Sequence, residues 1–136
     1  MDRLIIPGKL LDAIISHCKA GFPNEACGIL AGRGNEVSKV YTMSNADNSP
    51  VSYMMDPAEQ FKVMKDMREK KLDMVGIFHS HPSSAAYPSP KDMDLAFYDE
   101  AVYLIVSLAK GGPVVKGFTV REKEIHETGL IVGNSD

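Results

Sequence analysis

Residues 74–92 read MVGIFHSHPSSAAYPSPKD and combine a short apolar run, two histidines and a helix start. The apolar run at residues 74–78 is typical of a buried strand, and it leads directly into residues 79–82 (HSHP). After a loop, residues 89–92 (SPKD) offer a serine that can cap a helix and a proline suited to the first helical position. They predict a helix from Ser89 to about Tyr98.

The two histidines are spaced as metal ligands. Side chains two residues apart in a strand point to one face, so His79 and His81 can present both imidazoles to one ion. Catalytic zinc commonly takes three protein ligands and a water, and imidazole suits it. The third ligand should be acidic: Asp92 lies in the first helical turn, where a carboxylate is stabilised, whereas Asp94 faces a different direction. Singly, each residue is usually structural, and only their ordered combination predicts a zinc site.

Apolar periodicity and turn residues place the other elements. The spacing of apolar residues after Pro7 predicts an amphipathic helix that ends at residues 21–23 (GFP). Residues 56–59 (DPAE) predict a second helix, with Asp as the cap and Glu59 completing a capping box, that runs to about Lys70. Short apolar or alternating runs predict further strands at residues 26–31, 36–42, 101–108, 114–121 and 125–132.

This order of elements indicates the fold class. Helices interleaved with strands, including strands that follow one another directly, predict an α/β fold: a mixed, largely antiparallel β-sheet with helices packed on it. The sequence has no internal repeat, low-complexity tract or linker. A chain of 136 residues can bury a core without disulfides. We therefore expect one domain, residues 1–136.

Composition argues against several classes of partner. The net charge of −3 gives no excess of positive charge with which to bind nucleic acid or anionic lipid. No segment approaches the roughly 20 apolar residues that a membrane span needs, and we recognise no secretory signal at the start. Cys18 and Cys27 are the only cysteines. Two thiols without a signal fit a reducing compartment, so we expect a cytoplasmic protein.

Residues 79–92 resemble the signature of the JAMM metalloproteases, also called the MPN+ family. The signature H-x-H-x7-S-x2-D is matched in order by His79, His81, Ser89 and Asp92. The family also has an upstream glutamate, and residues 24–32 (NEACGILAG) look like the E-x-C-G-x-L-x-G form common in prokaryotic members, with Glu25 as the glutamate. The resemblance covers essentially the whole chain and implies the JAMM/MPN fold, which is cytidine-deaminase-like.

The resemblance also implies a role for each matching residue. His79, His81 and Asp92 match the family's zinc ligands, with one Zn²⁺ per chain. Glu25 matches the general base that takes a proton from water and later protonates the leaving amine. Ser89 matches the serine that steadies the tetrahedral intermediate, although a plain helix cap is its simpler interpretation. No required polar position departs from the family's pattern.

A substrate class follows from the same resemblance. Eukaryotic members remove ubiquitin, but this chain lacks the length for long insertions around the core and looks closer to compact prokaryotic members. Those are implied to act on ubiquitin-like sulfur-carrier proteins of the ThiS/MoaD type, by hydrolysing an amide bond after a C-terminal Gly-Gly. A flexible tail of this kind could add as a strand to an exposed sheet edge. The sequence is also compatible with a homodimer.

Other functions fit parts of the pattern. Two histidines and a carboxylate also form the iron site of oxygen-activating enzymes, but Glu25 beside the metal favours hydrolysis. A zinc nucleobase deaminase would need a P-C-x-x-C segment, which is missing. A non-catalytic scaffold or binding module of the same fold is the main alternative, and the complete ligand set argues against it. We expect Cys27 to be structural rather than a fourth ligand, His17 to be a surface residue, and His126 to be a strand or surface residue.

Overall fold

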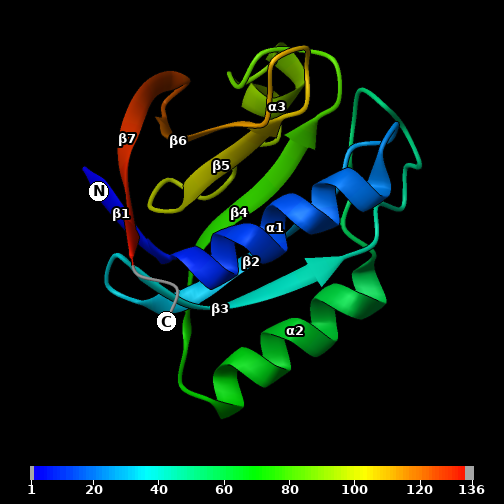
Figure 1. The fold of residues 1–136 in the computed structure, drawn as a ribbon. Coiled ribbons are helices and arrows are strands. Elements are labelled where there is room, and N and C mark those ends of the chain that lie inside the picture. The colour runs from blue at the N-terminus through cyan, green and yellow to red at the C-terminus, as the bar shows by residue number, and fades with distance from the viewer. Residues whose placement is uncertain (1, 134–136) are drawn as a thin grey trace.

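The strands of the protein close into a barrel (Figure 1), seen in a computed structural model that describes residues 2–133. Around the barrel the order is β1-β3-β2-β4-β5-β6-β7, and β7 returns to pair with β1. Along the chain the elements are β1 (Arg3–Pro7), α1 (Gly8–Gly21), β2 (Cys27–Arg33), β3 (Glu36–Met43), α2 (Pro57–Glu69), β4 (Asp73–His81), α3 (Pro90–Asp94), β5 (Val102–Ser107), β6 (Val114–Arg121) and β7 (Glu124–Gly133).

The sheet is mixed and largely antiparallel, which confirms the predicted fold class. Antiparallel pairing joins β2 to β3 and β4, and β6 to β5 and β7. Parallel pairing joins β4 to β5 and β1 to β7, and β1 meets β3 at a single residue pair. Strand β1 and the closure that it provides were not predicted. Its five residues run into α1 with no intervening turn, so no local signal separates the two elements.

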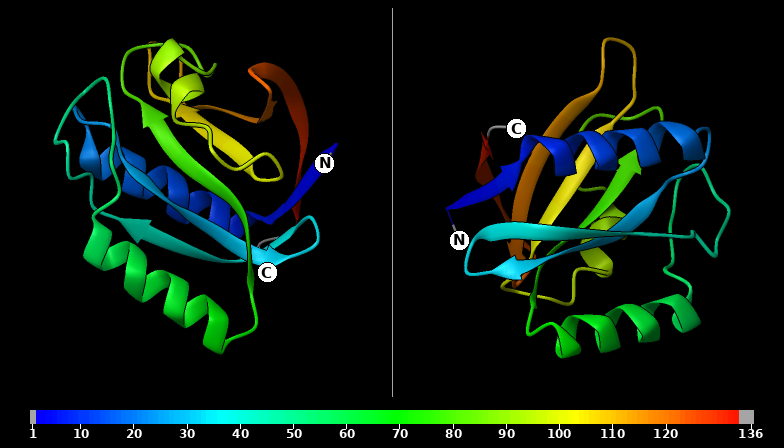
Figure 2. Two further views of the ribbon diagram at one scale, coloured as in Figure 1. Left: turned by 180° about the vertical axis from the view of Figure 1, so that it is seen from behind. Right: turned by 60° about the horizontal axis from the view of Figure 1, so that its bottom comes forward.

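Helices α1 and α2 cover opposite faces of the sheet (Figure 2). Ile14 of α1 packs in one buried cluster with Phe78, and Met67 of α2 packs in a second cluster with Ile77. The neighbouring β4 residues Ile77 and Phe78 thus point to different faces, as strand geometry requires. Within residues 2–133, no helix has the length and apolar character that a membrane crossing requires.

Helix α2 begins where predicted and has the predicted Asp56 cap, but Glu59 does not complete the capping box. The Asp56 carboxylate accepts hydrogen bonds from the amides of Ala58 and Glu59 at 2.9 and 3.0 Å. The expected return bond of a capping box is replaced, because Glu59 accepts from the Ser44 amide and hydroxyl, both at 2.7 Å. The start of α2 is therefore tied to the segment that follows β3.

The helix predicted from Ser89 to about Tyr98 is wrong in its length. Helix α3 ends at Asp94, and Leu95 occupies its C-cap. Beyond it the backbone turns more tightly, with the Phe97 amide bonded to the Leu95 carbonyl at 3.1 Å. The Tyr98 amide donates to the hydroxyl of Tyr103 on β5 at 3.1 Å. Residues 95–98 are thus held by a tight turn and by a bond to β5 rather than by a continued helix.

Candidate metal centre

Strand β4 carries both histidines to one end of the barrel. The strand was predicted to end at residue 78, but it continues through His81, so both ligand candidates are part of the sheet. His79 lies opposite Cys27 of β2 on one side and Ile105 of β5 on the other. His79 and His81 are only 1% and 2% exposed. Their backbone positions are therefore fixed by strands on both sides.

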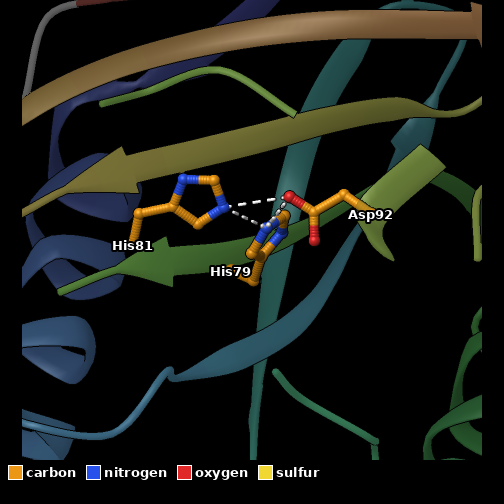
Figure 3. A group of neighbouring side chains, drawn as sticks. All are labelled: His79, His81 and Asp92. Atoms are coloured by element: carbon orange, nitrogen blue, oxygen red, sulfur yellow. Dashed lines mark hydrogen bonds and ion pairs between the residues drawn. The ribbon is translucent and has the colours of Figure 1, made fainter. Parts of the chain in front are cut away.

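Asp92 of α3 meets the two histidines at one point (Figure 3). The His79 Nε2 and His81 Nε2 atoms lie 3.1 Å apart, and they lie 3.1 and 2.9 Å from Asp92 Oδ2. Within residues 2–133 these three side chains are the one group of His, Cys, Asp and Glu residues with the spacing of a metal site. Asp94, the weaker alternative, is exposed and lies outside the group.

The size of this triangle suits a small divalent cation. Zinc bonds of about 2.0–2.1 Å in tetrahedral geometry separate neighbouring ligand atoms by about 3.3 Å. The three separations of 2.9–3.1 Å are close to that edge length. Two imidazoles and a carboxylate are also the ligand chemistry that zinc accepts at catalytic sites. The residues present therefore fit a metal with three protein ligands and an open fourth position.

Hydrogen bonds behind the cluster orient its side chains. The Nδ1 atom of His81 lies 2.8 Å from the Ala85 carbonyl oxygen. An Nδ1–H that donates to this carbonyl leaves the Nε2 lone pair directed at the cluster. The Ser89 amide donates to Asp92 Oδ2 at 2.9 Å, and the Asp92 amide donates to Ser89 Oγ at 3.1 Å. This capping box fixes Asp92 as part of the helix start.

Charge at the cluster also favours a cation. Burial acts to raise the pKa of Asp92, but hydrogen bonds from His79 and His81 outweigh it and hold that pKa below its usual range. Burial lowers the pKa of His79, which favours the neutral imidazole that metals bind. Burial also acts to lower the pKa of His81, but its bonds to Asp92 and to the Ala85 carbonyl reverse the net direction. A metal ion at the cluster would displace the proton that the charge of Asp92 otherwise favours on His81.

Glu25 lies beside the cluster, just before β2. The amide of Ala26 donates to Ser80 Oγ at 2.8 Å, and the amide of Ser80 donates to the Ala26 carbonyl at 3.0 Å. Because Ala26 is thus opposite Ser80, the ladder places Glu25 opposite His81 and on the same face. Two residues along, Cys27 lies opposite His79, which fixes this register.

The carboxyl of Glu25 has an unusual environment for an acid. Glu25 is 5% exposed, and within residues 2–133 its Oε1 atom is buried with no hydrogen-bond partner. Burial raises its pKa to about 7; the charge of His81 acts to lower it, Asp92 to raise it and Lys91 to lower it. A buried oxygen without a partner calls for a water or a substrate atom. A carboxyl with a pKa near 7 can both accept and return a proton at neutral pH.

Comparison with known proteins identifies the family to which this geometry belongs. Residues 7–121 match the family described as prokaryotic homologs of the JAB domain. The chain belongs to this family. The resemblance to JAMM/MPN proteins drawn from the sequence is thereby confirmed.

Curated relatives of this JAB-domain protein have names that describe peptidases. The CysO-cysteine peptidase of Mycobacterium tuberculosis is 39% identical over 106 residues, which are 76% of this chain and 73% of the relative. The desampylase of Pyrococcus furiosus is 38% identical over 132 residues, 96% of this chain and 91% of the relative. A probable TtuB-protein conjugate cleaving protease of Thermus thermophilus is 32% identical over 130 residues, 95% of this chain and 82% of the relative.

Solved structures of similar proteins share the fold. A protein from Desulfitobacterium hafniense is 40% identical, with a TM-score of 0.87 over 96% of this chain and 93% of the other. A JAB1/MPN domain protein from Archaeoglobus fulgidus is 21% identical, with a TM-score of 0.60 over 94% and 98% of the two chains. The second likeness shows the fold alone, and the fold is that of JAB1/MPN domains.

The other singled-out residues of the JAB-domain protein have mostly ordinary environments. Cys27 lies outside the metal cluster, its Sγ donates to the Ser44 carbonyl at 3.6 Å, and burial raises its pKa to about 12. His126 is exposed, as predicted. His17, predicted as a surface residue, is half-buried, and its Nε2 lies 3.1 Å from the Met43 carbonyl oxygen.

Tyr53 is a residue of the site that the sequence did not reveal. Its ring stacks on the imidazole of His79, with centroids 4.7 Å apart and planes 24° apart. Tyr53 belongs to the connection between β3 and α2. An aromatic residue in a loop carries no signal of this kind, since its partner is distant in sequence.

Proposed function

We propose that this protein is a zinc-dependent peptidase and isopeptidase that hydrolyses the amide bond after the C-terminal Gly-Gly of a ubiquitin-like sulfur-carrier protein. One observation carries the proposal: a cluster of metal-ligand geometry lies beside the buried carboxyl of Glu25, whose Oε1 has no hydrogen-bond partner within residues 2–133. The names of the relatives support a hydrolase that acts on protein conjugates of this type. A non-catalytic scaffold would not need to bury a carboxyl oxygen without a hydrogen-bond partner there.

The metal ligands in this proposal are His79, His81 and Asp92, with one zinc per chain. Zinc bound there supplies a Lewis acid that makes water a nucleophile near neutral pH. The nearly dry surroundings of the histidines, which are 1% and 2% exposed, strengthen electrostatic interactions at the reacting carbonyl.

Glu25 and Ser89 act on the substrate in this proposal. Glu25 takes a proton from the attacking water and delivers it to the leaving nitrogen, and the burial that acts to raise its pKa makes it a better base for this role. The Ser89 hydroxyl accepts a hydrogen bond from the Asp92 amide. It can still donate its own hydrogen to the substrate carbonyl oxygen, which becomes negative during attack. It is thus both a helix cap and a candidate oxyanion donor.

The natural partner that we propose is a carrier of the ThiS/MoaD type. The relatives named for CysO-cysteine and for TtuB conjugates support this class. We further propose that residues 1–136 form a single domain and that the protein works in the cytoplasm. Both described cysteines are unpaired, which fits a reducing compartment.

The test is a mass-spectrometric cleavage assay on a sulfur-carrier protein extended beyond its terminal Gly-Gly. Zinc-loaded wild type, Glu25→Gln and chelator-treated protein are compared. We expect ready cleavage after Gly-Gly by the wild type, cleavage slower by about 10²- to 10⁴-fold in Glu25→Gln and none after chelation, with zinc still bound at one per chain in Glu25→Gln. Zinc without cleavage would discard the substrate, whereas no zinc and no cleavage would favour the scaffold. Iron in place of zinc, with oxygen-dependent turnover, would favour an oxygen-activating enzyme.

A further inference from the structure

Asn45, just after β3, uses every hydrogen-bonding position of its side chain. Its Nδ2 donates to the carbonyl oxygens of Glu25 at 2.9 Å and Ser52 at 3.0 Å. Its Oδ1 accepts the amides of Asp47 at 2.9 Å and Met54 at 3.0 Å. An asparagine amide has two donor hydrogens and two acceptor lone pairs, so this capacity is filled. Such a half-buried hub fixes the local backbone around it.

One of the segments that this hub fixes is the backbone of Glu25. The Glu25 amide donates to the Ser49 carbonyl at 2.8 Å, and the Glu25 carbonyl accepts from Asn45. The next residue, Ala26, has both of its backbone groups bonded to Ser80, between the two histidines. The backbone at Glu25 is thus held on two sides: β4 bonds to the adjacent Ala26, and residues 44–56 bond to Glu25 itself.

Residues 44–56 also contact the metal cluster directly, through Tyr53. Tyr53, which stacks on His79, lies between Ser52 and Met54, and Asn45 bonds to the backbone of both. Ser44, immediately before Asn45, is tied to Glu59 of α2. Asn45 therefore connects the acid, the ring that covers a ligand, and a helix in one network.

We propose that Asn45 is a positioning residue that sets the place of the Glu25 carboxyl relative to the metal ligands. This inference rests on the proposed role of Glu25 as general base. Proton transfer requires the base within hydrogen-bond reach of the attacking water, and a displacement of about 1 Å can lower the rate on the order of 100-fold. Loss of the Asn45 donors frees the Glu25 carbonyl without removing any ligand or reacting group.

The decisive variant is Asn45→Asp, which separates the two halves of the amide. An aspartate keeps the acceptor oxygen for Asp47 and Met54, so the turn is preserved. It replaces the donor group by an oxygen that faces the carbonyls of Glu25 and Ser52. We expect kcat on the extended carrier protein to fall about 10- to 100-fold, with KM and the zinc dissociation constant unchanged.

Ser52→Ala serves as a control for this test, and Asn45→Ser as a substitute variant. Ser52→Ala removes only the bond from the Ser52 hydroxyl to Asp47 in the same segment, and kcat should stay within about twofold of wild type. Asn45→Ser, whose hydroxyl can keep the turn to Asp47 but is too short to reach Glu25, replaces Asn45→Asp if that variant fails to fold. Folding is checked by thermal melting of each zinc-free variant.

The Glu25→Gln background provides the sharpest comparison. Residues that act as a unit are non-additive, so Asn45→Asp should slow the residual rate of Glu25→Gln far less than it slows wild type. An equal loss in both backgrounds would overturn the proposal, and so would wild-type kcat in Asn45→Asp. Weaker zinc binding in parallel with kcat would show that Asn45 acts through the ligands instead. If wild type itself does not cleave the carrier, the proposed function fails rather than this inference.

Discussion

At the scale of single residues, the burial of Glu25 determines how activity depends on pH. Only the ionised carboxylate accepts a proton, and burial raises its pKa to about 7. A nearby divalent cation favours the ionised form and lowers that pKa. We therefore expect kcat/KM of the zinc-loaded protein to fall as the pH is lowered through a midpoint at or below about 7.

The measurement is the pH profile of wild type and Glu25→Gln on the same carrier protein. The acid limb should shift or disappear in Glu25→Gln, whose amide does not titrate. Because the attacking water titrates in the same range, the midpoint belongs to the coupled pair. An acid limb with the same midpoint in both proteins would assign it to another group.

Asp92 provides a second residue-scale prediction. Asparagine at this position keeps an oxygen that can accept the Ser89 amide, so α3 should keep its cap while the site loses its negative charge. Losing a group that only orients a metal ligand weakens metal binding by up to about 100-fold. Asp92 is proposed as a ligand itself, so we expect Asp92→Asn to weaken zinc binding by more than that. Competition titration with a chromophoric chelator measures it. Asp94→Asn, on the same short helix but exposed, is the matched control and should bind zinc like wild type.

At the scale of elements, the cap of α2 can be tested by itself. Asp56 accepts two backbone amides at the start of this helix. Asp56→Ala should lower the free energy of unfolding by about 1 kcal/mol, as for other N-cap replacements. Urea denaturation measures the change, with the exposed Asp12→Ala on α1 as a control expected within about 0.5 kcal/mol of wild type. A loss no larger than that of the control would mean that the cap adds nothing.

The elements also show how far the sequence could be interpreted. Caps and periodicity located α1, α2 and the strands within a few residues, because those signals are local. Strand β1 depends on β7, a partner distant in sequence. The segment after α3 bonds to Tyr103 of β5, a contact that the helix-start signal at Ser89 does not report. The cluster of His79, His81 and Asp92 was predicted from spacing and resemblance, and the structure brings these residues together. Tyr53 and Asn45 escaped prediction, since their roles arise only from tertiary contacts.

At the scale of the whole molecule, metal binding should stabilise the fold. A cation at the cluster would bind only the folded state, since it joins β4 to α3, and free zinc at 100 times its dissociation constant adds about 2.7 kcal/mol. Chelation should therefore lower the melting temperature of wild type on the order of 10 °C. Differential scanning calorimetry measures this, and Asp92→Asn should show little change. An equal shift in both proteins would place the stabilising metal elsewhere.

The pairing of β1 with β7 has a consequence for biosynthesis. Arg3 aligns with Gly129 and Pro7 with Gly133, so the sheet joins two strands that are far apart in the sequence, of which β1 is synthesised before β7. Leu4 and Ile6 of β1 are fully buried. Until β7 has left the exit tunnel, β1 lacks its main partner and the nascent chain exposes apolar residues that chaperones recognise. We expect a chain that includes β7, rather than an N-terminal portion that ends before it, to be the unit that folds.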